Sequence, residues 1–166
     1  MWGLPVARYD AQVSARAAWL LFGVSVAACG GNDLDRAPDT SISDLYASEL
    51  RRFDPGPNAG FGEERLPDVV LGAPVPGQGG GGSLDVLSLG VGGTIELGFG
   101  DQEIIDGPGP DFLVFENAFE IAMAPGEVFS ELAEVSVSKD GKAWITFPCD
   151  PSPTADWTGC AGWRPT

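Results

Sequence analysis

Carboxylates are the side chains in this 166-residue chain that are best placed to do chemistry. Asp106 and Asp111 bracket a stiff Gly-Pro-Gly-Pro turn, and Glu116 and Asn117 follow shortly after it. Oxygen ligands on a tight turn suit Ca²⁺, which takes roughly six to eight oxygens from carboxylates, amides and backbone carbonyls. The spacing is not that of an EF-hand. These four residues are our candidate Ca²⁺ ligands.

Charge balance supports the calcium hypothesis. The strongly apolar run 112–115 lies between Asp111 and Glu116, and a carboxylate at the end of a buried strand must be hydrogen-bonded, paired or metal-bound. No Lys, Arg or His occurs between Arg65 and Lys139, whereas twelve acidic residues do. Two alternatives stay open. The aspartates cap turns while Glu116 is solvated, or two of the three carboxylates form a catalytic pair.

Composition excludes several classes of function. The chain has no histidine, which removes Ser-His-Asp and Cys-His nucleophile systems and His-ligated zinc. It carries 24 acidic residues against 9 basic ones, for a net charge of −15. Such a surface repels nucleic acid and anionic lipid headgroups, so neither is expected as a partner.

The N-terminal segment is typical of an export signal. Arg8 and Arg16 precede the apolar run 17–28, which is shorter than the roughly 20 residues a membrane span needs and matches a signal-peptide core. Its end, Val26-Ala27-Ala28-Cys29, resembles the lipobox of bacterial lipoproteins. We therefore expect residues 1–28 to be a signal peptide and Cys29 to be acylated with diacylglycerol and palmitate. The alternative is a plain secretory signal that happens to end at a cysteine.

The three cysteines fit the same interpretation. If Cys29 carries lipid, Cys149 and Cys160 remain as one pair, closing a loop rich in Pro, Asp, Thr and Gly. In the chain-entropy account a disulfide here contributes roughly 3 kcal/mol. A metal pair is the alternative, and it has no histidine or further cysteine to complete it.

From Cys29 onwards the sequence divides into two regions that differ in their pattern of polar and apolar residues. Residues 29–60 are polar and predict a flexible tether, with one or two helical turns at 43–53, where apolar residues fall near helical spacing. Residues 61–166 alternate short apolar runs with turn signals and predict an all-β domain, an antiparallel β-sandwich. Asp140-Gly141 between two β-prone runs predicts a hairpin. The expected strands are 69–71, 86–89, 94–99, 112–116, 133–138 and 144–147.

Several motifs of this domain resemble a family of Gram-negative proteins known as "cell surface protein". The motifs are Val69-Val70-Leu71-Gly72, Gly82–Gly90, Gly92-Gly93-Thr94-Ile95, Asp106–Phe112, Val114-Phe115-Glu116-Asn117, Val135–Ser138, Asp140-Gly141, Trp144, Phe147-Pro148-Cys149 and Cys160-Ala161-Gly162. They span about residues 68–162. The resemblance implies a surface location and a β-sandwich, and it implies no activity. It also implies further strands after Cys160, so we expect this chain to be C-terminally truncated, with an unpaired sheet edge.

Residues 135–144 are also similar, more weakly, to a strand-turn-strand of discoidin-like, galactose-binding-type domains. That likeness implies a jelly roll with a structural Ca²⁺ and, in some members, a bound glycan. Trp144 on a strand is expected in the core. Trp157, inside the cysteine loop, is the better candidate for stacking on a sugar.

Together these features predict a non-enzymatic, lipid-anchored envelope protein whose domain binds a surface ligand such as a glycan. Because Gly30 rather than Asp follows the acylated cysteine, we expect sorting to the outer membrane, facing either the surface or the periplasm. A carboxylate-dependent hydrolase and a purely structural surface lipoprotein remain the competing hypotheses.

Overall fold

The computed structural model describes residues 10–15, 21–22, 45–77, 82–102, 104, 111–124, 126–152, 157 and 159–162. Cys29 and Asp106 lie outside these ranges, as does most of the tether. The described strands are β1 (Asp10–Ala15), β2 (Leu21–Phe22), β3 (Glu49–Asp54), β4 (Leu87–Ser88), β5 (Thr94–Gly98), β6 (Phe119–Glu120), β7 (Val128–Phe129), β8 (Ala133–Ser138) and β9 (Trp144–Thr146). Two 3-10 helices, Glu63–Arg65 and Asp68–Val70, lie between β3 and β4, and Leu45 is also 3-10 helical. The fold is all-β, as the sequence predicts.

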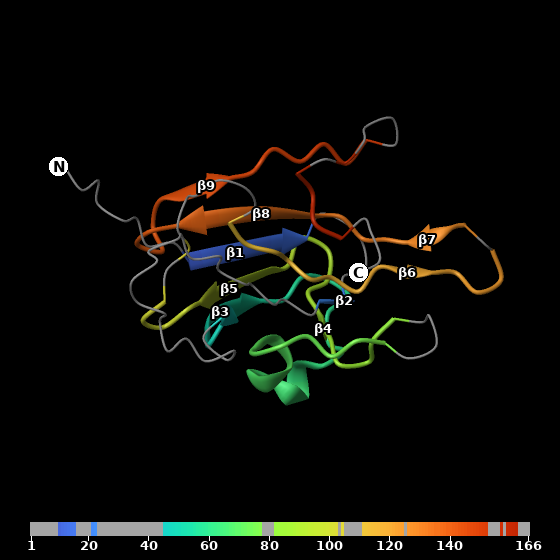
Figure 1. Cartoon of the computed structure of the whole chain (residues 1–166), viewed down its shortest axis with the longest axis horizontal. Coiled ribbons are helices and arrows are strands. Elements are labelled where there is room, and N and C mark those ends of the chain that lie inside the picture. The colour runs from blue at the N-terminus through green and yellow to red at the C-terminus, as the bar shows by residue number, and fades with distance from the viewer. Residues whose placement is uncertain are drawn as a thin grey trace, which may run out of the picture.

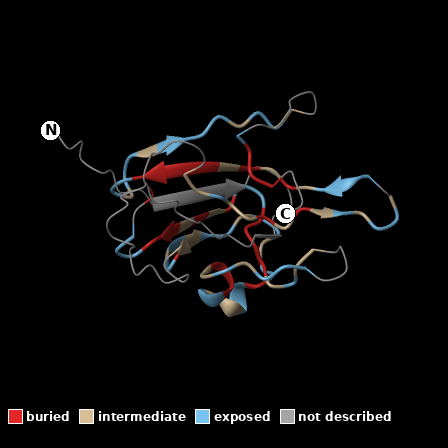
Figure 2. Ribbon diagram, in the orientation of Figure 1, coloured by how far each residue is buried: buried red, intermediate tan, exposed pale blue. Residues whose placement is uncertain are grey.

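Five strands form one antiparallel sheet in the order β3-β5-β1-β8-β9 (Figure 1). In this register Phe53, Ile95 and Val135 fall in one row across the sheet, while Arg52, Glu96, Ser136 and Thr146 fall in the next. Since side chains alternate between faces along a strand, one face is apolar and the other polar. Strands β5 and β8 are largely buried, whereas β9 at the edge is mostly exposed (Figure 2).

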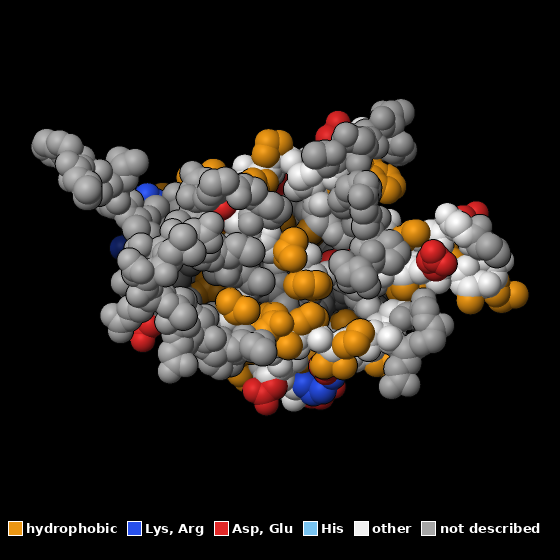
Figure 3. All heavy atoms as spheres, viewed as in Figure 1, with side chains coloured by type: hydrophobic (Ala, Val, Ile, Leu, Met, Phe, Trp, Pro, Cys, Tyr) orange, Lys and Arg blue, Asp and Glu red, His pale blue; other side chains and the backbone are white. Residues whose placement is uncertain are grey.

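The core lies against the apolar face of this sheet. Leu87 and Leu89, which belong to or follow β4, are fully buried in the same cluster as Ile95, Leu97 and Val135. β4 also pairs with β2 in a separate two-stranded sheet. Hydrophobic side chains are visible in the middle of this side of the molecule, in the area of β2 and β4 (Figure 3). Short strands with alternating burial thus assemble one hydrophobic core.

The hairpin predicted at Asp140-Gly141 is confirmed, and it joins β8 to β9. Gly141 has a φ of 66°, which glycine adopts without strain. Asp140 Oδ1 accepts hydrogen bonds of 2.9 Å from the amides of Ala143 and Lys142, and these two donors hold the pKa of Asp140 below its ordinary value. Ser138 Oγ donates to the Ala143 carbonyl at 2.7 Å. Ser138 Oγ also accepts from the amides of Asp140 and Gly141, so all four amides of residues 140–143 have local partners.

Of the described part of residues 43–53, Leu45 is in a 3-10 helix, whereas residues 49–53 are extended, so the predicted helical turns are wrong for 49–53. Glu49–Asp54 form β3, which pairs with β5 and places part of the predicted tether in the sheet. The register shifts between Leu50 and Arg52, so one residue is inserted opposite β5. This β-bulge puts Leu50 and Phe53, three residues apart, on the same apolar face. The bulge therefore produced a spacing that looks helical in the sequence.

Two predicted strands are not strands. Val69–Leu71 overlaps the 3-10 helix Asp68–Val70, which buries Val69 and Val70 against the core. The run Phe112–Phe115 is not paired in a ladder among the described residues, and Leu113 is 52% exposed. Phe112 and Val114 pack against the core from a loop. Short apolar runs carry no period that separates a strand from a buried loop or turn.

Strands β1 and β2 both fall within residues 1–28, which the sequence predicts to be a signal peptide. β1 lies in the middle of the main sheet and β2 pairs with β4. In the full chain, then, the N-terminal segment supplies backbone to two sheets. Among the described residues no helix is both long and apolar enough to cross a bilayer.

Candidate functional site

The disulfide predicted between Cys149 and Cys160 is present, with an S–S distance of 2.09 Å and a Cα–Cα distance of 4.7 Å. The segment after Cys160 is also fastened to the start of β8. Ala133 and Ala161 exchange two backbone hydrogen bonds of 3.1 and 3.0 Å, and the Glu131 amide donates to the Gly162 carbonyl at 3.2 Å. The chain that follows β9 is thereby returned to the sheet and held there.

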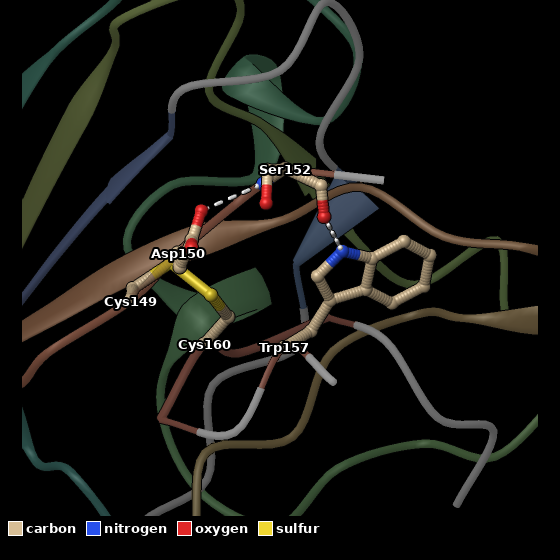
Figure 4. Close-up of a disulfide and its surroundings, with 5 residues drawn as sticks. All are labelled: Cys149, Asp150, Ser152, Trp157 and Cys160. Atoms are coloured by element: carbon tan, nitrogen blue, oxygen red, sulfur yellow. Dashed lines mark hydrogen bonds between the residues drawn. A yellow bond between two sulfur atoms is a disulfide. The ribbon is translucent and has the colours of Figure 1, made fainter. Parts of the chain in front are cut away.

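Trp157 is tied into the disulfide-closed loop by its own hydrogen bonds (Figure 4). Its indole Nε1 donates to the Ser152 carbonyl at 2.9 Å, and the Ser152 amide donates to Asp150 Oδ1 at 2.9 Å. The Cys160 amide donates to the Trp157 carbonyl at 3.0 Å. The half-buried ring is held in one orientation within the loop. Sugar stacking by this ring stays a prediction.

Three of the four predicted calcium ligands are described, and they lie on one segment packed beside the disulfide region. At its start Phe112 meets Phe147, with ring centroids 5.7 Å apart. At its end Glu116 lies beneath Gly162. Asp111 is half-buried and Glu116 is buried. Segment 111–117 thus lies beside Phe147 and Gly162, which flank the two cysteines of the disulfide.

The pKa of Glu116 is strongly shifted by its surroundings. Burial in a low-dielectric region raises the pKa of Glu116 to about 8, and the nearby Glu131 carboxylate adds to this rise. Hydrogen bonds from the backbone amides of Asn117 and Ala118 act in the opposite direction and lower the pKa. The residue exposes only 9% of its surface, and its Oε2 has no hydrogen-bond partner among the described residues. At neutral pH this carboxyl is therefore mostly protonated in the folded chain.

Gly162 is required where it covers Glu116. A Cβ at position 162 would lie 2.1 Å from the Glu131 carbonyl oxygen and 3.1 Å from Glu116 Cδ, and the residue has a φ of 86°. Only glycine combines that close approach with that backbone conformation. Glu131 and Gly162 were not among the candidates chosen from sequence. The signal for Gly162 lay in the Cys160-Ala161-Gly162 motif, whereas nothing near Glu131 separated it from the other acids.

Asn117 uses its side chain to hold another part of the backbone. Its Oδ1 accepts from the Ser83 amide at 2.6 Å, and its Nδ2 donates to the Ser83 carbonyl at 3.1 Å. Gly82 must be small here, because a Cβ would lie 2.7 Å from Phe119 Cδ1. Asn117 thus acts as a fastener between two loops, and its role as a metal ligand stays a prediction.

The described residues contain no group of three or more His, Cys, Asp or Glu side chains arranged to hold a metal. The predicted set depends on Asp106, which lies outside them. Asp85, another of the acids in the interval without local cations, is neutralised by Arg65, which also donates to the carbonyls of Leu84 at 2.9 Å and Val86 at 3.2 Å. Part of the negative charge is therefore balanced by a cation from the edge of that interval.

Comparisons with protein-family models, curated proteins and solved structures find no match to this chain.

Proposed function

We propose that this protein is a lipid-anchored component of the cell envelope that acts by binding and not by catalysis. The observation that carries the proposal is the Cys149–Cys160 disulfide. Disulfides persist in oxidising compartments outside the cytosol, so this pair supports export. The lipobox-like sequence ending in Cys29 supplies the route of export and the anchor, and Gly30 favours the outer membrane.

The domain we propose is a β-sandwich of the jelly-roll kind. Two observations support a second layer facing the five-stranded sheet. Leu87 and Leu89, in and after β4, are buried in the same cluster as Ile95 and Val135 of the main sheet. β4 itself pairs with β2 and not with the main sheet.

Binding is favoured over hydrolysis by where the perturbed acid lies. A general acid needs a pKa near the working pH, which Glu116 has, but it must also reach the substrate. Glu116 is buried, beneath Gly162. Trp157, held rigidly in the disulfide-closed loop, is the aromatic side chain we propose for contact with a surface ligand such as a glycan. A structural Ca²⁺ is also part of the proposal, and its proposed ligands are Asp106, Asp111, Glu116 and Asn117.

The anchor is tested by expressing the full chain and its Cys29→Ser variant with radiolabelled palmitate. We expect label and membrane association in the wild type, and an unlabelled, soluble product from the variant. Cys160→Ser is the matched control, because it removes a different thiol and should keep the label. Palmitate incorporated into Cys29→Ser would contradict the proposed anchor.

A further inference from the structure

The main sheet is held together through a strand that the proposed processing would remove. β5 and β8 do not pair with each other, since β1 lies between them and is antiparallel to both. Val13 is aligned with Ile95 on one side and Val135 on the other, and Ala11 with Leu97 and Val137. Each interior amide of β1 therefore donates to one neighbour or the other.

Loss of β1 would leave a gap one strand wide. Neighbouring strands lie about 4.8 Å apart, so β5 and β8 would be separated by roughly 10 Å, too far to hydrogen-bond directly. Two rows of backbone groups would lose their partners, and each group left buried and unpaired would destabilise the sheet. Ile95, Leu97, Val135 and Val137, now at most 7% exposed, would border the gap. The processed sheet requires a replacement strand.

We propose that the space between β5 and β8 is a strand-binding site, filled by residues 10–15 in the full chain and open to an extended peptide from another molecule once the leader is removed. The proposal rests on the processing at Cys29 proposed above. The mode of recognition is β-augmentation, in which main-chain hydrogen bonds give affinity and alternate side chains give specificity. The structure itself holds an example of the occupant, because β1 is a six-residue strand seated in the site.

The neighbours of the site define the chemistry of the peptide. The positions of Ala11 and Val13 lie in rows with buried Leu97, Val137, Ile95 and Val135, so the peptide needs small or β-branched apolar residues there. The positions of Gln12 and Ser14 lie in rows with Glu96 and Glu134 on the other face. Together with the net charge of −15, this favours uncharged or basic residues at those positions and disfavours acidic ones.

The experiment uses the full chain as its Cys29→Ser variant, purified with its disulfide intact and carrying a specific protease site within residues 23–28. Cutting there removes no described strand, but it breaks the covalent link between β1 and the chain that follows the cut. A fluorescent peptide of residues 7–16 is then added to cut and uncut protein. We expect saturable binding to cut protein only, because in the uncut chain the tethered strand competes at an effective concentration in the millimolar range.

Variant peptides test whether the main chain is what binds. Val13→Pro removes one amide donor, and we expect it to bind about tenfold more weakly or worse. Val13→Thr, which keeps the amide and the β-branched shape, is the matched control. Equal binding of the Pro and Thr peptides would contradict the proposal. A cut chain that releases its fragment, stays folded and binds no peptide would also contradict the proposal. A cut chain that fills the gap by dimerising would contradict it as well.

If the cut chain unfolds, adding excess peptide tests the site in a second way. Recovery of β structure when excess peptide is added would support the site, and failure to recover would overturn it. None of these readouts involves acylation. A failed palmitate experiment with successful peptide exchange would therefore refute the anchor and leave the strand site standing.

Discussion

At the scale of single residues, the pH dependence of stability should report on Glu116. The unfolded chain ionises this acid near the ordinary value of 4.5, whereas burial keeps it protonated in the folded chain up to about 8. The folded state binds the extra proton between those values, so its stability falls as pH rises through that window, by about 1.4 kcal/mol per pH unit. Glu116→Gln stays neutral and should escape this loss.

The measurement is urea unfolding of wild type and Glu116→Gln from pH 5 to pH 8. Between pH 5 and pH 8 we expect the free energy of unfolding of the variant to rise relative to that of the wild type by about 2 kcal/mol or more. Glu120→Gln is the matched control, since Glu120 is exposed on β6, and its curve should run parallel to that of the wild type. A parallel curve for Glu116→Gln would show that this carboxyl is ionised at neutral pH in the folded chain.

Calcium would reverse the electrostatics of the same residue, because a nearby divalent cation favours the ionised form of Glu116. If the proposed site binds Ca²⁺, the ion should stabilise the wild type by about 2.7 kcal/mol at 100-fold excess over its dissociation constant. Thermal melting at pH 7.5 with Ca²⁺ or EDTA measures this. Asp111→Asn should abolish the response, while Asp101→Asn, at an exposed turn, should keep it. A melting temperature indifferent to Ca²⁺ and EDTA would remove calcium from the proposal.

At the scale of elements, the sequence predicts what depends on local pattern. β5, β8 and β9 were expected from alternation and from Asp140-Gly141, and the structure confirms them. β3 was missed because a bulge changes its period, and Phe112–Phe115 was misassigned because four apolar residues pack equally well in a loop. At the site, Cys149–Cys160 followed from counting thiols. The proximity of Glu116 to Glu131 and Gly162 depends on long-range packing, which has no local signal.

The disulfide is the element whose removal should act most locally. Replacing both cysteines, Cys149→Ser with Cys160→Ser, should lower the free energy of unfolding by about 3 kcal/mol, since the unfolded chain regains loop entropy. The bridge between Ala133 and Ala161 is nearby, so hydrogen exchange at these two amides should accelerate more than at β5, which lies on the other side of β1. Equal acceleration in β5 and at Ala161 would mean that the disulfide supports the whole sheet and not this corner.

At the scale of the whole molecule, charge should select the ligand. The net charge of −15 repels anionic polymers at long range and leaves uncharged glycans unaffected. On a glycan array we therefore expect binding to neutral sugars, with little salt dependence and no turnover. Trp157→Ala should abolish it, whereas Trp157→Phe, which keeps an aromatic face and loses only the hydrogen bond to Ser152, should retain most of it. Both variants should keep the Cys149–Cys160 disulfide, verified by mass spectrometry, so that lost binding is not mistaken for a lost loop. Binding that survives Trp157→Ala would place the ligand elsewhere, and binding to anionic glycans alone would contradict the electrostatic argument.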